Sequence, residues 1–194
     1  MDDLFLAFAS AFFGGIAAAV TGLIIYNQQR RENITQKYID EFLSDSMLRH
    51  RIVAGKIHQR LRSETRPSQD DQDPFSIERL ARGFWNAGPT AEYSSYKGPT
   101  DPHTGLNEHQ SLEAILQYIS RLVMNIERRN IYLADYKLAV HDSYIWLYQV
   151  LDPLEKEIKR QADEHRKMGG TVKGIHRINR LRKLKRLLEI PHEH

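Results

Sequence analysis

The stretch NEHQSLEAILQYISRLVMNIERR, residues 107–129, decides the fold class of this chain. Its apolar side chains recur three and four residues apart, at Leu112, Ile115, Leu116, Ile119, Leu122, Val123 and Ile126. This spacing places them on one face of an α-helix. No alternating pattern of the kind that strands show, and no internal repeat, is visible in the rest of the sequence. The sequence therefore predicts an all-α fold.

A second helical pattern follows this stretch after a turn near Asn130. It begins around Leu133 and is apolar around most of its circumference, which is typical of a central helix. Asp152-Pro153 either kinks this helix or caps a new one. The pattern continues to Met168, where Gly169-Gly170 ends it. We predict that residues 107–168 form a helical hairpin core.

The region before residue 107 divides into two predicted segments. An apolar stripe from Ile34 to Leu61 predicts a juxtamembrane helical segment over residues 32–63, which Ser44-Asp45-Ser46 would break. Residues 64–106 are predicted to be a linker with a short helix that opens at Asp73-Pro74 and an irregular loop rich in glycine and proline.

The N-terminal residues 4–26 carry no charged side chain. A helix needs roughly 20 apolar residues to cross a bilayer, so we expect one transmembrane helix here, followed by an irregular helical bundle. Asp2 and Asp3 precede the segment, and Arg30 and Arg31 follow it. Because Lys and Arg favour the cytoplasmic side, we expect a single-pass protein of the inner membrane with its N-terminus outside and its C-terminal domain cytoplasmic. A cleaved signal peptide is the alternative, but the acidic start and the length of the run disfavour it.

Small residues recur at four-residue spacing within the same segment. They form two neighbouring ridges on a helix, one with Ala11, Gly15 and Ala19 and the other with Gly14, Ala18 and Gly22. Such ridges allow two helices to approach closely. We therefore expect self-association or a protein partner in addition to the lipid bilayer.

Residues 171–189 predict a basic amphipathic helix. Apolar residues recur every third position, and the basic side chains between them include Arg177, Arg180, Lys183 and Arg186. This helix could contact anionic lipid, bind the phosphates of a nucleic acid, or pack its apolar stripe on the bundle. A membrane tether would favour lipid over nucleic acid.

Residues that could carry chemistry are few. The chain has no cysteine, and its nine histidines show no metal-binding spacing, so neither a metal nor another cofactor is expected. Arg160 and His165 match the Arg-x4-6-His spacing of a family of all-α ribonucleases in prokaryotic defence and toxin systems. The similarity to that family implies that His165 acts as the general acid–base and that Arg160 holds a phosphate. Charged helices also produce this spacing freely.

The layout resembles small bacterial membrane proteins that have one N-terminal span and a cytosolic helical domain. The resemblance rests on residues 4–26, on the polar segment Gln28-Gln29-Arg30-Arg31 that follows them, and on the helical pattern from Leu106 to Lys159. It implies location and fold only. We expect a non-enzymatic module for scaffolding or regulation at the cytoplasmic face. The alternative is a membrane-localised effector, a ribonuclease that uses Arg160 and His165.

Overall fold

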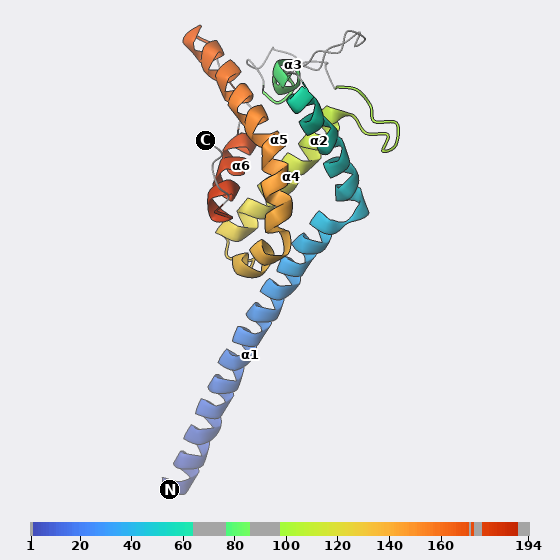
Figure 1. Cartoon of the computed structure of the whole chain (residues 1–194). Helices are drawn as coiled ribbons and strands as arrows, with labels where there is room; N and C mark the ends of the chain where they lie inside the picture. Colours follow the sequence, from blue (N-terminus) through green and yellow to red (C-terminus); the bar gives the residue numbers. More distant parts are fainter. Residues whose placement is uncertain (1, 64–76, 86–97, 171, 173–175, 190–194) are drawn as a thin grey trace.

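The computed structural model describes residues 2–63, 77–85, 98–170, 172 and 176–189, without the side chains of residues 2–12, 176 and 177. Its helices are α1 (Asp2–Leu43), α2 (Asp45–Ser63), α3 (Ile77–Arg82), α4 (Glu108–Glu127), α5 (Leu133–Lys167) and α6 (His176–Leu187) (Figure 1). Over the described ranges there is no strand, only an isolated bridge between Thr100 and Asn107. The predicted all-α class and helical bundle are confirmed.

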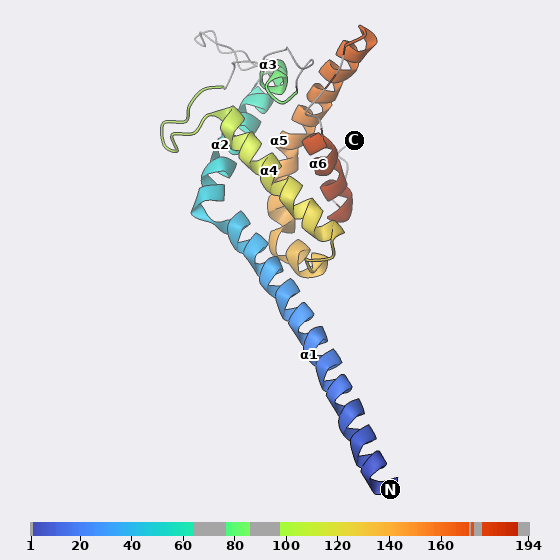
Figure 2. The same ribbon diagram turned by 180° about the vertical axis from the view of Figure 1, so that it is seen from behind.

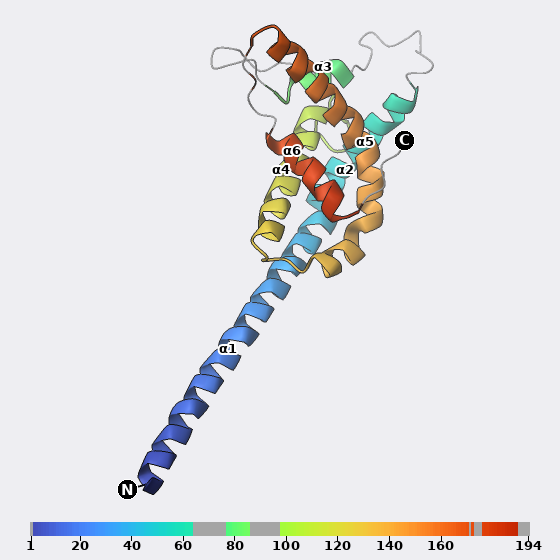
Figure 3. The same cartoon turned by 90° about the vertical axis from the view of Figure 1, so that its left-hand side faces the viewer.

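The helices form an irregular bundle from which one end of α1 projects. Helix α4 lies against α2 and α6, whereas α5 lies against α1, α2 and α3. The N-terminal part of α1 extends away from all the other helices in every view (Figures 1, 2 and 3). The bundle therefore covers only the C-terminal part of this 42-residue helix.

The prediction of a transmembrane helix over residues 4–26 is wrong. In the part of the chain that the structure describes, no helix is both long enough and apolar enough to cross a membrane. Helix α1 continues without a break past this segment, through the polar residues 27–31, to Leu43. The single-pass topology and the inner-membrane location were derived from that prediction, so these two predictions are wrong as well.

Ser44 separates α1 from α2 by acting as a helix cap. Its hydroxyl donates to the carbonyl of Glu41 over 2.7 Å and accepts from the backbone N–H of Met47 over 3.3 Å. A serine in this position satisfies an N–H that the first turn of a helix leaves unpaired. The break expected at Ser44-Asp45-Ser46 therefore occurs at its first residue. Of the predicted linker, α3 is described, whereas Asp73-Pro74 and most of the loop lie outside the described residues.

Helix α4 begins where its sequence predicts. The Asn107 side chain accepts from the N–H of Gln110 over 2.8 Å, and the Gln110 side chain accepts in return from the Asn107 N–H. This reciprocal pair is a capping box. The helix ends in a turn in which Arg129 takes a positive φ of 56°.

Helix α5 runs through Pro153 without interruption, so no new helix begins there. Gly169, at a φ of 81°, ends it as expected, and the N–H of Gly170 donates to the carbonyl of His165. The sequence places Leu138 among the apolar residues of this helix, but its side chain is 89% exposed. Helix periodicity alone does not show which part of an apolar circumference a neighbour covers.

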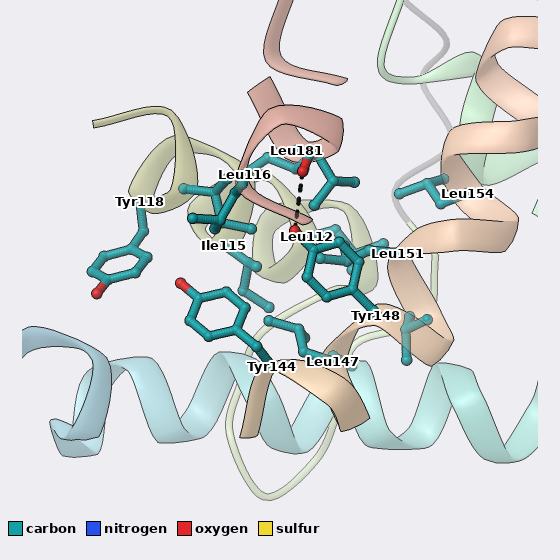
Figure 4. Packing of buried hydrophobic residues seen from close by; sticks show 14 of the residues in the cluster. Leu112, Ile115, Leu116, Tyr118, Tyr144, Leu147, Tyr148, Leu151, Leu154 and Leu181 are labelled. Atoms are coloured by element: carbon teal, nitrogen blue, oxygen red, sulfur yellow. Dashed lines mark hydrogen bonds between the residues drawn. The ribbon is translucent and has the colours of Figure 1, made fainter. Parts of the chain in front are cut away.

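The core joins α4, α5 and α6 with the C-terminal end of α1, with α2 and with α3, and Figure 4 shows its centre. Three buried tyrosines link their hydroxyls: Tyr118 to Tyr136 over 2.7 Å, and Tyr136 to Tyr144 over 3.1 Å. The Tyr148 hydroxyl donates to the carbonyl of Leu181 over 3.0 Å, which ties α6 to α5 (Figure 4). Each of these four tyrosine hydroxyls thereby has a partner, as buried polar groups require.

Two ion pairs hold the segment before α4 against α2. Lys56 pairs with Asp101, whose other carboxylate oxygen accepts from the N–H groups of His103 and Thr104. Arg60 pairs with Glu108 in the first turn of α4. These contacts connect residues 45 and 48 positions apart in sequence, so no local pattern could predict them.

Candidate functional site

The most unusual surface of this molecule is the projecting part of α1, residues 13–26, which we call the arm. Its large apolar side chains are between 46% and 69% exposed: Phe13, Ile16, Val20, Leu23, Ile24, Ile25 and Tyr26. Ile24, Ile25 and Tyr26 are consecutive, and successive residues point about 100° apart around a helix. Apolar side chains therefore face outward in several directions.

The small-residue ridges predicted on this helix lie on the arm. Gly14, Gly15, Ala18, Ala19 and Gly22 are all exposed. A Cβ atom added at any of the three glycines would meet nothing within 4 Å. The side chain of Ala11 lies outside the described residues. These positions give the arm a flank along which another backbone could approach closely.

The base of the arm is fixed to the bundle by polar contacts. The Thr35 hydroxyl accepts from the N–H of Tyr132 over 2.9 Å, and the Arg31 guanidinium lies 4.0 Å from the centroid of the Tyr132 ring. Further along α1, the carbonyl of Tyr38 accepts from the Tyr118 hydroxyl over 2.7 Å. Because α1 is one continuous helix, these contacts also set the direction of the arm.

Arg160 and His165 do not form a common site. Arg160 donates two hydrogen bonds to Glu157, over 2.6 and 2.8 Å, and another to Glu164 over 2.8 Å. These carboxylates raise the pKa of Arg160 and occupy the donors that a phosphate would need. Residues five apart on a helix point about 140° apart, so His165 faces elsewhere.

His165 instead packs in a structural position at the end of α5. Its ring centroid lies 5.4 Å from that of Trp85, and its Nε2 atom is buried without a hydrogen-bond partner. A Cβ atom on Gly170 would lie 2.0 Å from that Nε2. The ribonuclease alternative therefore finds no support in this geometry.

The basic C-terminal helix packs its apolar stripe into the bundle. Ile178, Leu181, Leu184 and Leu188 are buried. Lys185, also buried, pairs with Asp152 and lies 5.6 Å from the centroid of the Tyr148 ring.

The cations that we expected to contact lipid or phosphate have different surroundings. Lys183 pairs with Glu127 and lowers the pKa of that carboxyl, and the charge of Arg180 contributes to the same shift. Arg186 is exposed, and the side chain of Arg177 lies outside the described residues. The structure thus shows the third of the uses considered for this helix, packing on the bundle. A phosphate contact stays a prediction.

The residues described contain no group of three or more His, Asp or Glu side chains placed to hold a metal ion. No protein-family model, curated protein or solved structure matches the chain. The resemblance to small bacterial membrane proteins consequently stays untested.

Proposed function

We propose that the protein is a non-enzymatic helical interaction module that self-associates through its arm. The observation that carries the proposal is the exposure of large apolar side chains in several directions around residues 13–26. Fully burying one such side chain contributes about 1.5–3 kcal/mol relative to leaving it in water. A helix with this pattern normally has its apolar surface covered by a neighbour.

A second copy of the chain suits the arm better than a charged partner. From Phe13 to Gln29 there is no charged side chain, so nothing in that range selects an opposite charge or repels an identical helix. The exposed glycines and alanines let two such helices approach closely. In a pair related by a twofold axis, each arm would present the same surface to the other. In such an assembly, the surfaces of the bundles would determine which other molecules the copies bind.

The experiment measures the mass of the full-length chain in detergent-free buffer across a range of concentrations. We expect dimers or larger assemblies for the natural chain, and dissociation for Leu23→Glu. Losing one buried leucine from each of two copies is worth about 3 kcal/mol, or ~100-fold in the dissociation constant, before the added charges are counted. Met168→Glu is the matched control, because Met168 is an exposed apolar residue, at 78%, far from the arm in the chain.

Crosslinking tests the geometry separately. Because the chain has no cysteine, Ala18→Cys offers a single thiol on the arm, and Asn179→Cys offers one on the exposed surface of α6. We expect oxidation to link two copies through the arm only, and Gly15→Leu to reduce the linkage by blocking close approach. A chain that stays monomeric at all concentrations in detergent-free buffer, or an Asn179→Cys chain that crosslinks as well as Ala18→Cys, would contradict the proposal.

A further inference from the structure

A second apolar surface lies between α2 and α5, away from the arm. It is a groove of about 500 Å³ with apolar lining from Leu48, Ile52 and Gly55 on α2 and from Trp146 on α5. Leu48 and Ile52 each remain 43% exposed. The groove is therefore open along its length and suits an elongated ligand better than an enclosed small molecule.

Gly55 determines the shape of this groove. A Cβ atom at this position would lie 3.3 Å from Cζ2 of Trp146, so the absent side chain lets the indole ring lie close to α2. A glycine inside a helix is less favourable than an alanine. The close approach of the indole ring gives a structural reason for a residue that is otherwise unfavourable here.

The groove also contains a cation that forms no ion pair with any of the described residues. Arg51 lines it, and its guanidinium carbon lies 4.7 Å from the centroid of the Phe42 ring. Its Nε atom is buried, and no side chain in the described part of the molecule accepts a hydrogen bond from it. Burial lowers the pKa of Arg51. On the opposite wall, Asp142 is fully exposed and faces the ring of its neighbour His141 at 3.4 Å.

We propose that this groove binds an α-helix of another protein that carries bulky apolar side chains and one carboxylate on the same face. The apolar side chains would lie between Leu48, Ile52 and Trp146, and the carboxylate would accept from Arg51. Helices commonly bind grooves through apolar residues three or four apart. A carboxylate and a guanidinium form strong, charge-assisted hydrogen bonds.

The occupant that we propose is not the apolar part of the arm, because that part cannot supply the carboxylate. From Phe13 to Gln29 the chain has no acid. Groove binding is separate from self-association: the arm joins copies of the chain, whereas the groove on each bundle binds a helix of another protein. The two surfaces can be tested independently.

The test uses full-length protein labelled with 5-fluorotryptophan, which gives fluorine signals from Trp85 and Trp146 only. The probe is a synthetic amphipathic helical peptide with leucine and phenylalanine one turn apart and a glutamate on the same face. We expect it to shift the Trp146 signal, which Trp146→Phe identifies. A hydrogen bond to a charged group is worth about 1.5–3 kcal/mol, so replacing the glutamate with glutamine should weaken binding by ~10-fold or more.

Protein variants test whether Arg51 causes the preference for the glutamate peptide over the glutamine peptide. Arg51→Gln should bring the affinity for the glutamate peptide down to that for the glutamine peptide, whereas Arg51→Lys should retain part of the preference. Arg49→Gln is the matched control, since Arg49 is an exposed cation on α2 and residues two apart do not share a helix face. Circular dichroism confirms that each variant remains folded.

Equal affinity for the two peptides, or a glutamate preference that survives Arg51→Gln in a folded protein, would overturn the inference. So would binding that leaves the Trp146 signal unmoved, or no binding of the probe at all. The variant Leu23→Glu separates this result from the proposed function. It should abolish self-association and change the peptide affinity by less than twofold.

Discussion

Replacing Glu108 with glutamine should make the protein more stable at alkaline pH and remove part of its pH dependence. Glu108 is 1% exposed, and its Oε2 atom is buried without a hydrogen-bond partner. Burial raises the pKa of this carboxyl to about 7 from 4.5, although the charge of Arg60 opposes the shift. The folded chain therefore holds a proton that the unfolded chain releases.

The sign of the effect follows from proton linkage. Between pH 4.5 and 7 the folded state binds more protons than the unfolded state, so the free energy of unfolding falls as the pH rises. The contribution is fully present below pH 4.5 and is lost as the pH rises through 7. Between pH 5 and 8.5 the loss is about 2.5 kcal/mol for a shift of this size.

The assay is urea unfolding of the natural chain and of Glu108→Gln at several pH values. The difference between their free energies of unfolding isolates Glu108, because the other titrating groups are common to both proteins. We expect the natural chain to lose about 2.5 kcal/mol relative to the variant between pH 5 and 8.5.

Arg60→Met supplies a second check on the same reasoning. Removing the opposing charge should raise the pKa of Glu108 further, so the loss of stability should be larger and should occur at higher pH. If the free energy of unfolding of the natural chain, relative to that of Glu108→Gln, is constant or rises with pH, Glu108 is not buried away from water as described.

Three further substitutions test the packing around this core, each followed by urea unfolding. Gly98→Ala should destabilise the chain by about 1–3 kcal/mol, because φ is 71° there and the new Cβ would lie 2.5 Å from Oε2 of Glu108. An unchanged urea midpoint would contradict this backbone conformation at Gly98. Ile57→Ala, at a fully buried position, should cost about 2–5 kcal/mol, and a loss below 1 kcal/mol would show that the site is not packed as described. Tyr118→Phe should cost about 1–3 kcal/mol, because it leaves the Tyr136 hydroxyl without one of its partners; a neutral effect would mean that the hydroxyl chain is not formed.

The sequence determined the helices of this protein, because the signals for a helix are local. Hydrogen bonds in a helix join residues four apart, so periodicity and end groups within a short stretch specify it. Asn107 with Gln110, Ser44 and Gly169 each mark a boundary that the structure contains at that residue or within one of it. The apolar face of residues 112–123 is likewise buried as predicted.

Local patterns were less informative about which surfaces neighbours cover. Leu138 follows the apolar pattern of α5 and yet is exposed, whereas Glu108, whose side chain is ionisable, is buried. The same limit applies to charge: the basic stripe of α6 reads as a surface for phosphate, but Lys183 and Lys185 pair with carboxylates on α4 and α5. Such partners lie dozens of positions away in the chain.

The groove between α2 and α5 was not found from the sequence, although Gly55 inside a predicted helix was a signal for close approach. Its lining comes from residues 48–55 and 142–146, which only the packing of two helices brings together. Helices form from contacts between near neighbours in the chain, so the sequence alone specified them. Binding surfaces and buried charges arise from contacts between distant residues, so only the tertiary structure decided them.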